Sequence, residues 1–192
     1  MNSESKNRIG LRTAGLIVGV SLTAMTILSA LIFPSLKNSP AHMSGILIII
    51  MLDLVIAWGL YVLLEPVNKD LSLLMSIFRI VFASVFAVAL SQLGTPESFY
   101  LIWDIALALI GIHLIILGYL AYKSGFLPRI LGILVLVAGI GYAVDTFLKF
   151  FGVGFTISTF TFVGEVLFGL WLLFMWRKIP SRESLVNSKK VF

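Results

Sequence analysis

Four ionisable side chains that could bind a ligand or carry a proton lie deep inside long apolar segments of the sequence. They are Asp53, Arg79, His113 and Glu165. Charge is costly in hydrocarbon, so such residues usually pair with one another or mark a binding or proton-transfer site. Arginine stays charged at any accessible pH, so Arg79 needs a carboxylate, backbone carbonyls or water beside it. Asp53 is its expected partner, with Glu165 as the competing one.

Three interpretations of this group remain open. A structural ion pair would fix the register of the helices, as buried pairs often do. A ligand or proton site would use Arg79 to hold an anionic group and His113 to handle a proton. Alternatively, the long stem of Arg79 would carry its charge to the inner interface. His113 also suits a plain hydrogen bond between helices.

The residue pattern gives little support to a metal or a cofactor. His113, Asp53 and Glu165 have suitable ligand atoms, but no two of them share a segment at ligand spacing. The other histidine, His42, lies near the outer end of its segment and is too distant in depth to share a haem iron. The chain has no cysteine and none of the common hydrolase or phosphate-loop motifs. We therefore expect no metal and no cofactor.

A second polar group lies nearer the outer surface and consists of Asp104, Asp145 and Lys149. Asp145 and Lys149 are four residues apart on one segment, in the favourable order for an ion pair. We expect this group to form mostly a hydrated outer rim.

The segments that must position these residues are transmembrane helices. The chain has 192 residues, of which 59% are hydrophobic and 12% charged, and a soluble domain cannot bury that much apolar surface. All the prolines fall at or near the segment ends, as expected for uninterrupted helices. The predicted class is an all-α, polytopic integral membrane protein, a single domain over 1–192 built as a compact bundle of six helices. The spans cover about 12–34, 41–64, 71–93, 98–122, 127–150 and 155–177.

Lysine and arginine predict the orientation of the bundle. Most lysines and arginines fall on the side of the predicted membrane that holds both termini, and the other side has only Lys37 and Lys149. Because cytoplasmic loops are rich in these residues, both termini should be cytoplasmic. The net charge of +5 then indicates contact with anionic lipid headgroups on the cytoplasmic side, and no nucleic acid. The cations assigned to the cytoplasmic side are Lys6, Arg8, Arg12, Lys69, Lys123, Arg129, Arg177, Lys178, Arg182, Lys189 and Lys190.

Glycines predict where helices approach closely. Gly15 and Gly19 form a small-xxx-small pair in the first span, which favours contact with another helix. We expect that helix to belong to the same chain, with a homo-oligomer as the alternative. Gly132, Gly139 and Gly141 make the fifth span thin as well.

Two stretches of the chain resemble a known family. They are AWGLYVLLEPVNKDLSLL at 57–74, followed by Arg79, and GIHLIILGYLAYKSGFLPRILGILVLVAGIGYAVD at 111–145. Both are similar to bacterial membrane proteins of the domain-of-unknown-function family 4386. The resemblance implies a six-helix membrane protein with no assigned activity. The motif positions that it singles out are Asp53, Arg79, His113, Tyr119, Ser124, Arg129 and Asp145.

The loop within the second stretch, at residues 124–129, is expected to cap the helices on either side of it. Ser124 and Gly125 can end one helix, with glycine adopting the left-handed cap, and Pro128 is tolerated in the first turn of the next. Arg129 would then lie at the level of the inner headgroups. Structural capping is the main interpretation, with recognition of a lipid headgroup as the alternative.

These features predict a non-enzymatic, multi-pass protein of the bacterial plasma membrane. Its polar pocket would bind or move a small amphipathic molecule, whose identity stays open, or a proton. One alternative is an intramembrane enzyme acting on a lipid or isoprenoid, with His113 as its base or as a metal ligand. The other is a structural or regulatory subunit whose buried charges only fix packing.

Overall fold

Helices make up the regular structure in the part of the chain that the computed structural model describes, namely residues 9–35, 39–153, 157 and 162–189. Two short 3₁₀ segments, η2 (Phe33–Ser35) and η3 (Trp176–Lys178), extend α1 and α7. The α-helices are α1 (Leu11–Ile32), α2 (Pro40–Leu64), α3 (Lys69–Leu90), α4 (Pro96–Lys123), α5 (Arg129–Phe150), α7 (Val163–Met175) and α8 (Arg182–Lys189).

Capping residues set several of these boundaries. The Ser39 hydroxyl accepts from the backbone N–H of His42 at the start of α2, and the Asn68 carboxamide accepts from Leu71 at the start of α3. Gly125 follows the end of α4 with φ +73°, the left-handed conformation that glycine adopts without strain. The helix end predicted at Ser124 and Gly125 is confirmed.

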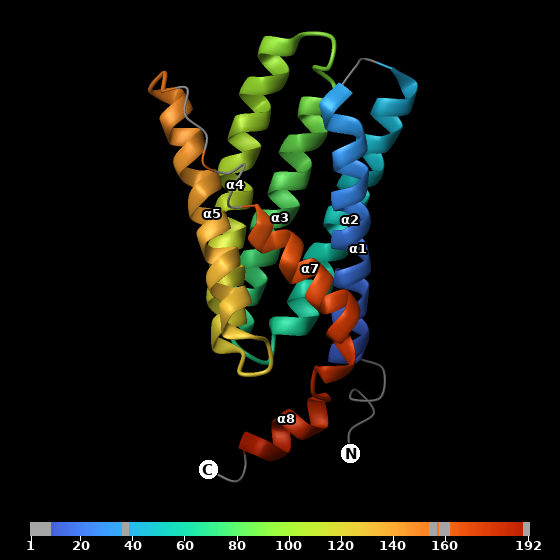
Figure 1. Ribbon diagram of the computed structural model, residues 1–192, viewed down its shortest axis with the longest axis vertical. Helices are drawn as coiled ribbons and strands as arrows, with labels where there is room; N and C mark the ends of the chain where they lie inside the picture. The colour runs from blue at the N-terminus through green and yellow to red at the C-terminus, as the bar shows by residue number, and fades with distance from the viewer. Residues whose placement is uncertain (1–8, 36–38, 154–156, 158–161, 190–192) are drawn as a thin grey trace.

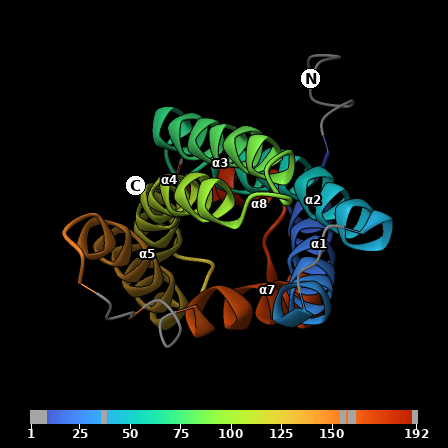
Figure 2. The same ribbon diagram turned by 90° about the horizontal axis from the view of Figure 1, so that it is seen from above.

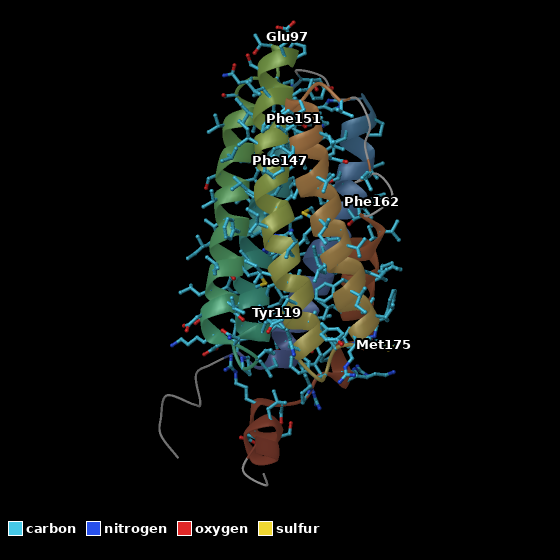
Figure 3. All side chains as sticks on the ribbon, turned by 90° about the vertical axis from the view of Figure 1, so that its left-hand side faces the viewer. Glu97, Tyr119, Phe147, Phe151, Phe162 and Met175 are labelled. Carbon is cyan, nitrogen blue, oxygen red and sulfur yellow. The ribbon has the colours of Figure 1, made fainter. Side chains whose placement is uncertain are left out.

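Five helices, α1 to α5, are long and apolar enough to cross a membrane. They run alternately up and down, and the loops α2–α3 and α4–α5 lie at the end where α1 begins (Figure 1). Large apolar side chains point outward along the bundle, among them Phe147, Phe151 and Phe162, whereas Glu97 lies at one tip (Figure 3). An exposed apolar surface of this extent fits a lipid environment and, with five helices of spanning length, indicates a multi-pass membrane protein.

The first five predicted spans coincide with these helices to within a few residues. The sixth, predicted at 155–177, falls partly on residues 154–156 and 158–161, which lie outside the described ones. Its described portion is α7, a helix of 13 residues, whereas a full span needs about 20. Six spans and two cytoplasmic termini therefore stay predictions.

Glycines allow the closest contacts between helices. A Cβ built on Gly118 of α4 would lie 2.6 Å from the carbonyl oxygen of Gly132 of α5, and one on Gly139 would lie 2.6 Å from that of Gly111. The pair Gly15 and Gly19 faces α7 and the residue after η3, because added Cβ atoms would meet the side chain of Ile179 and the backbone of Leu173. The close approach predicted for α1 is thus made within the chain.

The segment after α7 packs against the rest of the bundle. Arg12 donates through Nε to the backbone oxygen of Ile179 at 2.7 Å, and Ile179 is fully buried. Arg182 pairs with Glu65 at the end of α2, with 3.2 Å between Nη2 and Oε2. The short helix α8 then lies across the end of the bundle (Figure 1).

Two apolar cores divide the bundle along its length. One, built around Leu60, Leu114 and Leu172, occupies the half in which α1 begins. The other, around Ile46 and Phe86, occupies the opposite half. Seen from above, α1, α2, α3, α4, α5 and α7 surround a common centre (Figure 2). The layer between the two cores holds the candidate site.

Candidate functional site

The polar layer between the cores brings together the four residues predicted at depth. Asp53 comes from α2, Arg79 from α3, His113 from α4 and Glu165 from the first turn of α7. On α2, Asp53 lies between Ile50 of one core and Ile56 of the other. Four helices therefore each place one ionisable group at the same level. We call these residues the charge cluster.

Arg79 is the centre of the charge cluster. Its Nη2 donates to Asp53 Oδ1 at 2.6 Å, and its Nη1 lies 3.6 Å from Glu165 Oε1. The side chains of Arg79 and Asp53 are each 1% exposed. The expected pairing with Asp53 is thus confirmed, and Glu165, the competing partner, contacts Arg79 as well at the longer distance. The alternative in which Arg79 extends to the inner interface is wrong, because the guanidinium is held inside the bundle.

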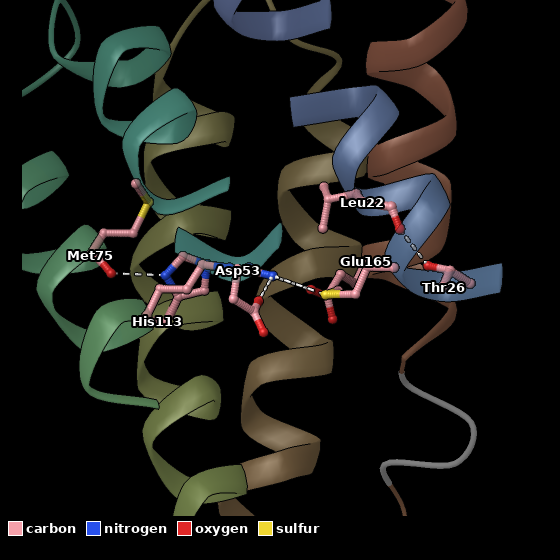
Figure 4. Close-up of polar contacts among 8 residues, drawn as sticks. Leu22, Thr26, Asp53, Met75, His113 and Glu165 are labelled. Atoms are coloured by element: carbon pink, nitrogen blue, oxygen red, sulfur yellow. Dashed lines mark hydrogen bonds and ion pairs between the residues drawn. The ribbon is translucent and has the colours of Figure 1, made fainter. Parts of the chain in front are cut away.

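His113 holds Arg79 from the other side. Its Nδ1 lies 2.9 Å from the backbone oxygen of Met75, and a carbonyl only accepts, so Nδ1 carries the proton. Nε2 then accepts from Arg79 Nη1 at 3.1 Å. Both ring nitrogens are therefore occupied, as Figure 4 shows for the bond to Met75. This geometry indicates that His113 positions the guanidinium, and it does not favour a role for His113 in proton transfer.

Charge is not balanced within the cluster. One guanidinium faces two carboxylates, because Arg79 is the cation that pairs with both Asp53 and Glu165 among the described residues. Asp53 Oδ2 and Arg79 Nε are buried without a hydrogen-bond partner in the described part of the chain. The Glu165 side chain is 16% exposed, which makes it the accessible carboxylate. The open face of the cluster is therefore acidic.

A cavity of about 230 Å³ lies against this acidic face. Aromatic side chains form much of its wall, and Trp103 packs edge-on against Phe33 and Phe86 with ring centroids 4.8 and 5.0 Å away. The lining residues are Met25, Ser29, Phe33, Ile49, Asp53, Arg79, Phe82, Phe86, Trp103, Leu107, Ile110, Tyr142 and Glu165. A charged floor with apolar and aromatic walls suits a small amphipathic molecule.

The four secondary candidates lie elsewhere. Tyr119 is 43% exposed on the outer face of α4. The Ser124 hydroxyl donates to Ala121 O at 2.7 Å and accepts from the N–H of Leu127, so it shapes the loop. Arg129 lies over the ring of Tyr122. None of these, nor Asp145, lines the cavity.

The outer polar group differs from the expected rim. Lys149 Nζ lies 2.5 Å from Asp104 Oδ1, which joins α5 to α4. Asp145 is only 1% exposed and accepts from the backbone N–H of Ile157 at 2.7 Å. A hydrated rim is therefore wrong for Asp145, because its carboxylate is enclosed by the protein. The ion pair between Asp145 and Lys149 stays a prediction.

Sequence reasoning missed the aromatic wall of the cavity. One signal was available on α3, where Arg79, Phe82 and Phe86 follow a spacing of three and four residues and so share a helix face. Trp103 of α4 also lines the cavity, and its inward position had no signal in the sequence. The carbonyl of Met75 that orients His113 had no signal in the sequence.

Metal binding is not favoured by this arrangement. Among the described residues, no group of three or more histidine, aspartate or glutamate side chains is placed to hold a metal ion. His113 and the two carboxylates converge on the cationic group of Arg79 instead.

Comparison with known proteins assigns the family. The model of the family described as "Domain of unknown function (DUF4386)" matches residues 41–97 and 95–176, which include the whole charge cluster. The chain belongs to the DUF4386 family. The family resemblance seen in the sequence is confirmed.

A relative of this DUF4386 protein is known from Archaeoglobus fulgidus, where it is named "Uncharacterized protein". It is 44% identical over 155 residues, which cover 81% of this chain and 96% of the relative. Because that organism is archaeal, a bacterial origin stays a prediction. No solved structure matches the chain.

Proposed function

We propose that this DUF4386 protein is a non-enzymatic membrane protein whose charge cluster binds or moves a small amphipathic molecule or a proton. The observation that carries the proposal is the position of the cluster. Ionisable residues inside a bundle are costly unless paired, and here one carboxylate, Glu165, is both weakly paired and accessible from a cavity. A cluster needed only for packing would gain nothing from an open side.

A structural role is the second candidate, and a specific contact favours it. Arg79 connects α2 and α4 through Asp53 and His113, with the ion pair at 2.6 Å and almost fully buried. Such contacts fix helix register whether or not a ligand binds. The two roles are compatible. They differ in one respect, because only the binding role predicts that removal of the Glu165 charge abolishes retention of a ligand.

We further propose six spans with both termini cytoplasmic in a prokaryotic plasma membrane. Among the described cations outside the charge cluster, only Lys149 lies at the end opposite the start of α1 (Figure 1). The other four cations on which the predicted orientation rests, Lys6, Arg8, Lys37 and Lys190, lie outside the described residues. The described cations at the other end, such as Lys69 and Arg177, support binding to anionic headgroups there.

Native mass spectrometry of the gently solubilised protein tests the binding role. Wild type is compared with Glu165→Gln, which removes the accessible charge, and with Asp104→Asn, a matched change in the outer ion pair. We expect a defined small molecule retained by wild type and by Asp104→Asn but lost from Glu165→Gln. Equal retention by all three, or no retained molecule in any of them, would contradict the proposal.

A further inference from the structure

The class of ligand follows from the charges that face the cavity. Asp53 lies 2.6 Å from the guanidinium of Arg79 and is its nearer partner, whereas Glu165 lies 3.6 Å away. The second carboxylate thus has no cation of its own among the described residues. Asp53 Oδ2, buried and without a hydrogen-bond partner in this part of the chain, is a further acceptor in the cavity wall. An excess of negative charge in apolar surroundings attracts a cation or a proton.

Arg79 is poorly placed to receive an anion. Its side chain is 1% exposed, and both terminal nitrogens already have partners in Asp53, His113 and Glu165, so the buried Nε is the one nitrogen of the guanidinium without an acceptor among the described residues. An anion would need to displace a carboxylate, and it would add to the negative charge already present. The anionic ligand that the sequence suggested is therefore disfavoured.

The walls of the cavity suit a ligand that joins a cationic group to an apolar body. Phe33, Phe82, Phe86, Trp103 and Tyr142 line the cavity together with the two carboxylates. Aromatic faces attract ammonium groups through their quadrupole, most strongly where water is excluded. Aliphatic side chains complete the wall and can pack against an apolar body.

From these observations we infer that the cavity binds a small amphipathic organic cation, a protonated amine with an apolar body. This inference rests on the proposed function and names the ligand class of the same site. The ammonium group is placed between Glu165 and Asp53 Oδ2, with its apolar part among the aromatic rings.

A proton should compete with this cation. The titratable and charged groups facing Glu165 are Asp53 from α2, Arg79 from α3 and Tyr142 from α5. His113 of α4 reaches it only through Arg79, and α1 contributes the neutral Met25 and Ser29. With the cavity empty, a proton on a carboxyl group balances the charge. Binding of the ammonium ion then releases that proton to solvent, so one cation is exchanged for one proton.

Three probes of nearly the same shape test the charge preference. They are 2-phenylethylammonium, neutral 2-phenylethanol and anionic phenylacetate, measured by equilibrium dialysis against the protein in lipid nanodiscs with empty nanodiscs subtracted. We expect the ammonium probe to bind roughly tenfold or more tightly than either analogue. Its affinity should rise with pH by up to about tenfold per unit, while that of the alcohol stays constant.

Two variants locate the binding. Glu165→Gln should abolish the preference for the cation, and Asp104→Asn should keep it. Should Glu165→Gln fail to fold, as judged by circular dichroism, Trp103→Leu provides the second test. This change leaves the charge cluster intact and should lower the affinity for the ammonium probe more than the affinity for the alcohol.

The outcomes separate this inference from the proposed function. If phenylacetate or the alcohol binds as tightly as the ammonium probe, the ligand class is wrong although the cavity still binds small molecules. If none of the probes exceeds empty nanodiscs, the inference is overturned. The proposed function is then judged by native mass spectrometry alone.

Discussion

Arg79 is the one cation that pairs with two carboxylates at the centre of the described bundle. Its removal should therefore lower the free energy of unfolding. Asp53 and Glu165 both depend on its guanidinium. Arg79→Met would leave two carboxylates in apolar surroundings, and breaking a buried pair from one side costs about 3–5 kcal/mol. We expect a fall of that order in the free energy of unfolding, measured by circular dichroism in detergent.

The matched test of this explanation removes all three charges together. The variant Asp53→Leu, Arg79→Met and Glu165→Leu buries apolar groups in place of ions, so it should recover most of the lost stability. If the site also binds a ligand, this stable variant should retain none. A triple variant less stable than Arg79→Met would contradict the charge explanation.

His113 is expected to act by positioning Arg79. In His113→Leu, the N–H of Arg79 Nη1 that faced the imidazole loses its acceptor, and the carbonyl of Met75 keeps only its hydrogen bond within α3. An unsatisfied buried polar group costs about 1–3 kcal/mol, so the unfolding free energy should fall by at least that range. The control is Tyr119→Phe on the exposed face of α4, which should stay within about 0.5 kcal/mol of wild type. Equal stability of the two variants would exclude the positioning role.

At the scale of helices, the glycine contacts between α4 and α5 determine how closely the two can pack. Gly118→Ala adds a Cβ that would lie 2.5 Å from the backbone nitrogen of Leu136 and 2.6 Å from Gly132 O. Alanine favours a helix by about 1 kcal/mol over glycine, but backbone atoms cannot rotate away, and overpacking costs about 1–3 kcal/mol. We expect net destabilisation in thermal unfolding.

Gly10→Ala is the matched control for this change. The same methyl group there would meet nothing within 4 Å. Its unfolding temperature should stay close to that of wild type. If Gly118→Ala is as stable as Gly10→Ala, the two helices are free to separate and the close packing is not required.

Long helices and deep charges could be predicted from the sequence, because both depend on hydropathy along the chain. Asp53 and Arg79 stand out among apolar neighbours, and the short loop between their helices brings them together. What could not be predicted is which face of each helix points inward. Lipid and protein interior are both apolar, so periodicity is weak, and the inward position of Trp103 and the burial of Asp145 were missed.

At the scale of the whole molecule, the charge cluster separates two apolar cores and has one open side. The core around Leu60 is continuous from α1 to α7 in one half of the bundle, whereas the cavity lies toward the core around Phe86. A ligand would therefore reach the cluster from the half of the membrane that contains Phe33 and Trp103. The orientation of the bundle decides whether that half is the extracellular one.

Single cysteines can establish this orientation, because the natural chain has none and each introduced thiol is unique. Glu97→Cys lies at the tip of α4, and Lys178→Cys lies in η3 at the opposite end. The excess of lysine and arginine at the η3 end predicts that this end is cytoplasmic. In intact cells, a membrane-impermeant maleimide should label Glu97→Cys and should label Lys178→Cys only after permeabilisation. The reverse pattern would place the cavity on the cytoplasmic side, and it would require the amine to be supplied from inside the cell.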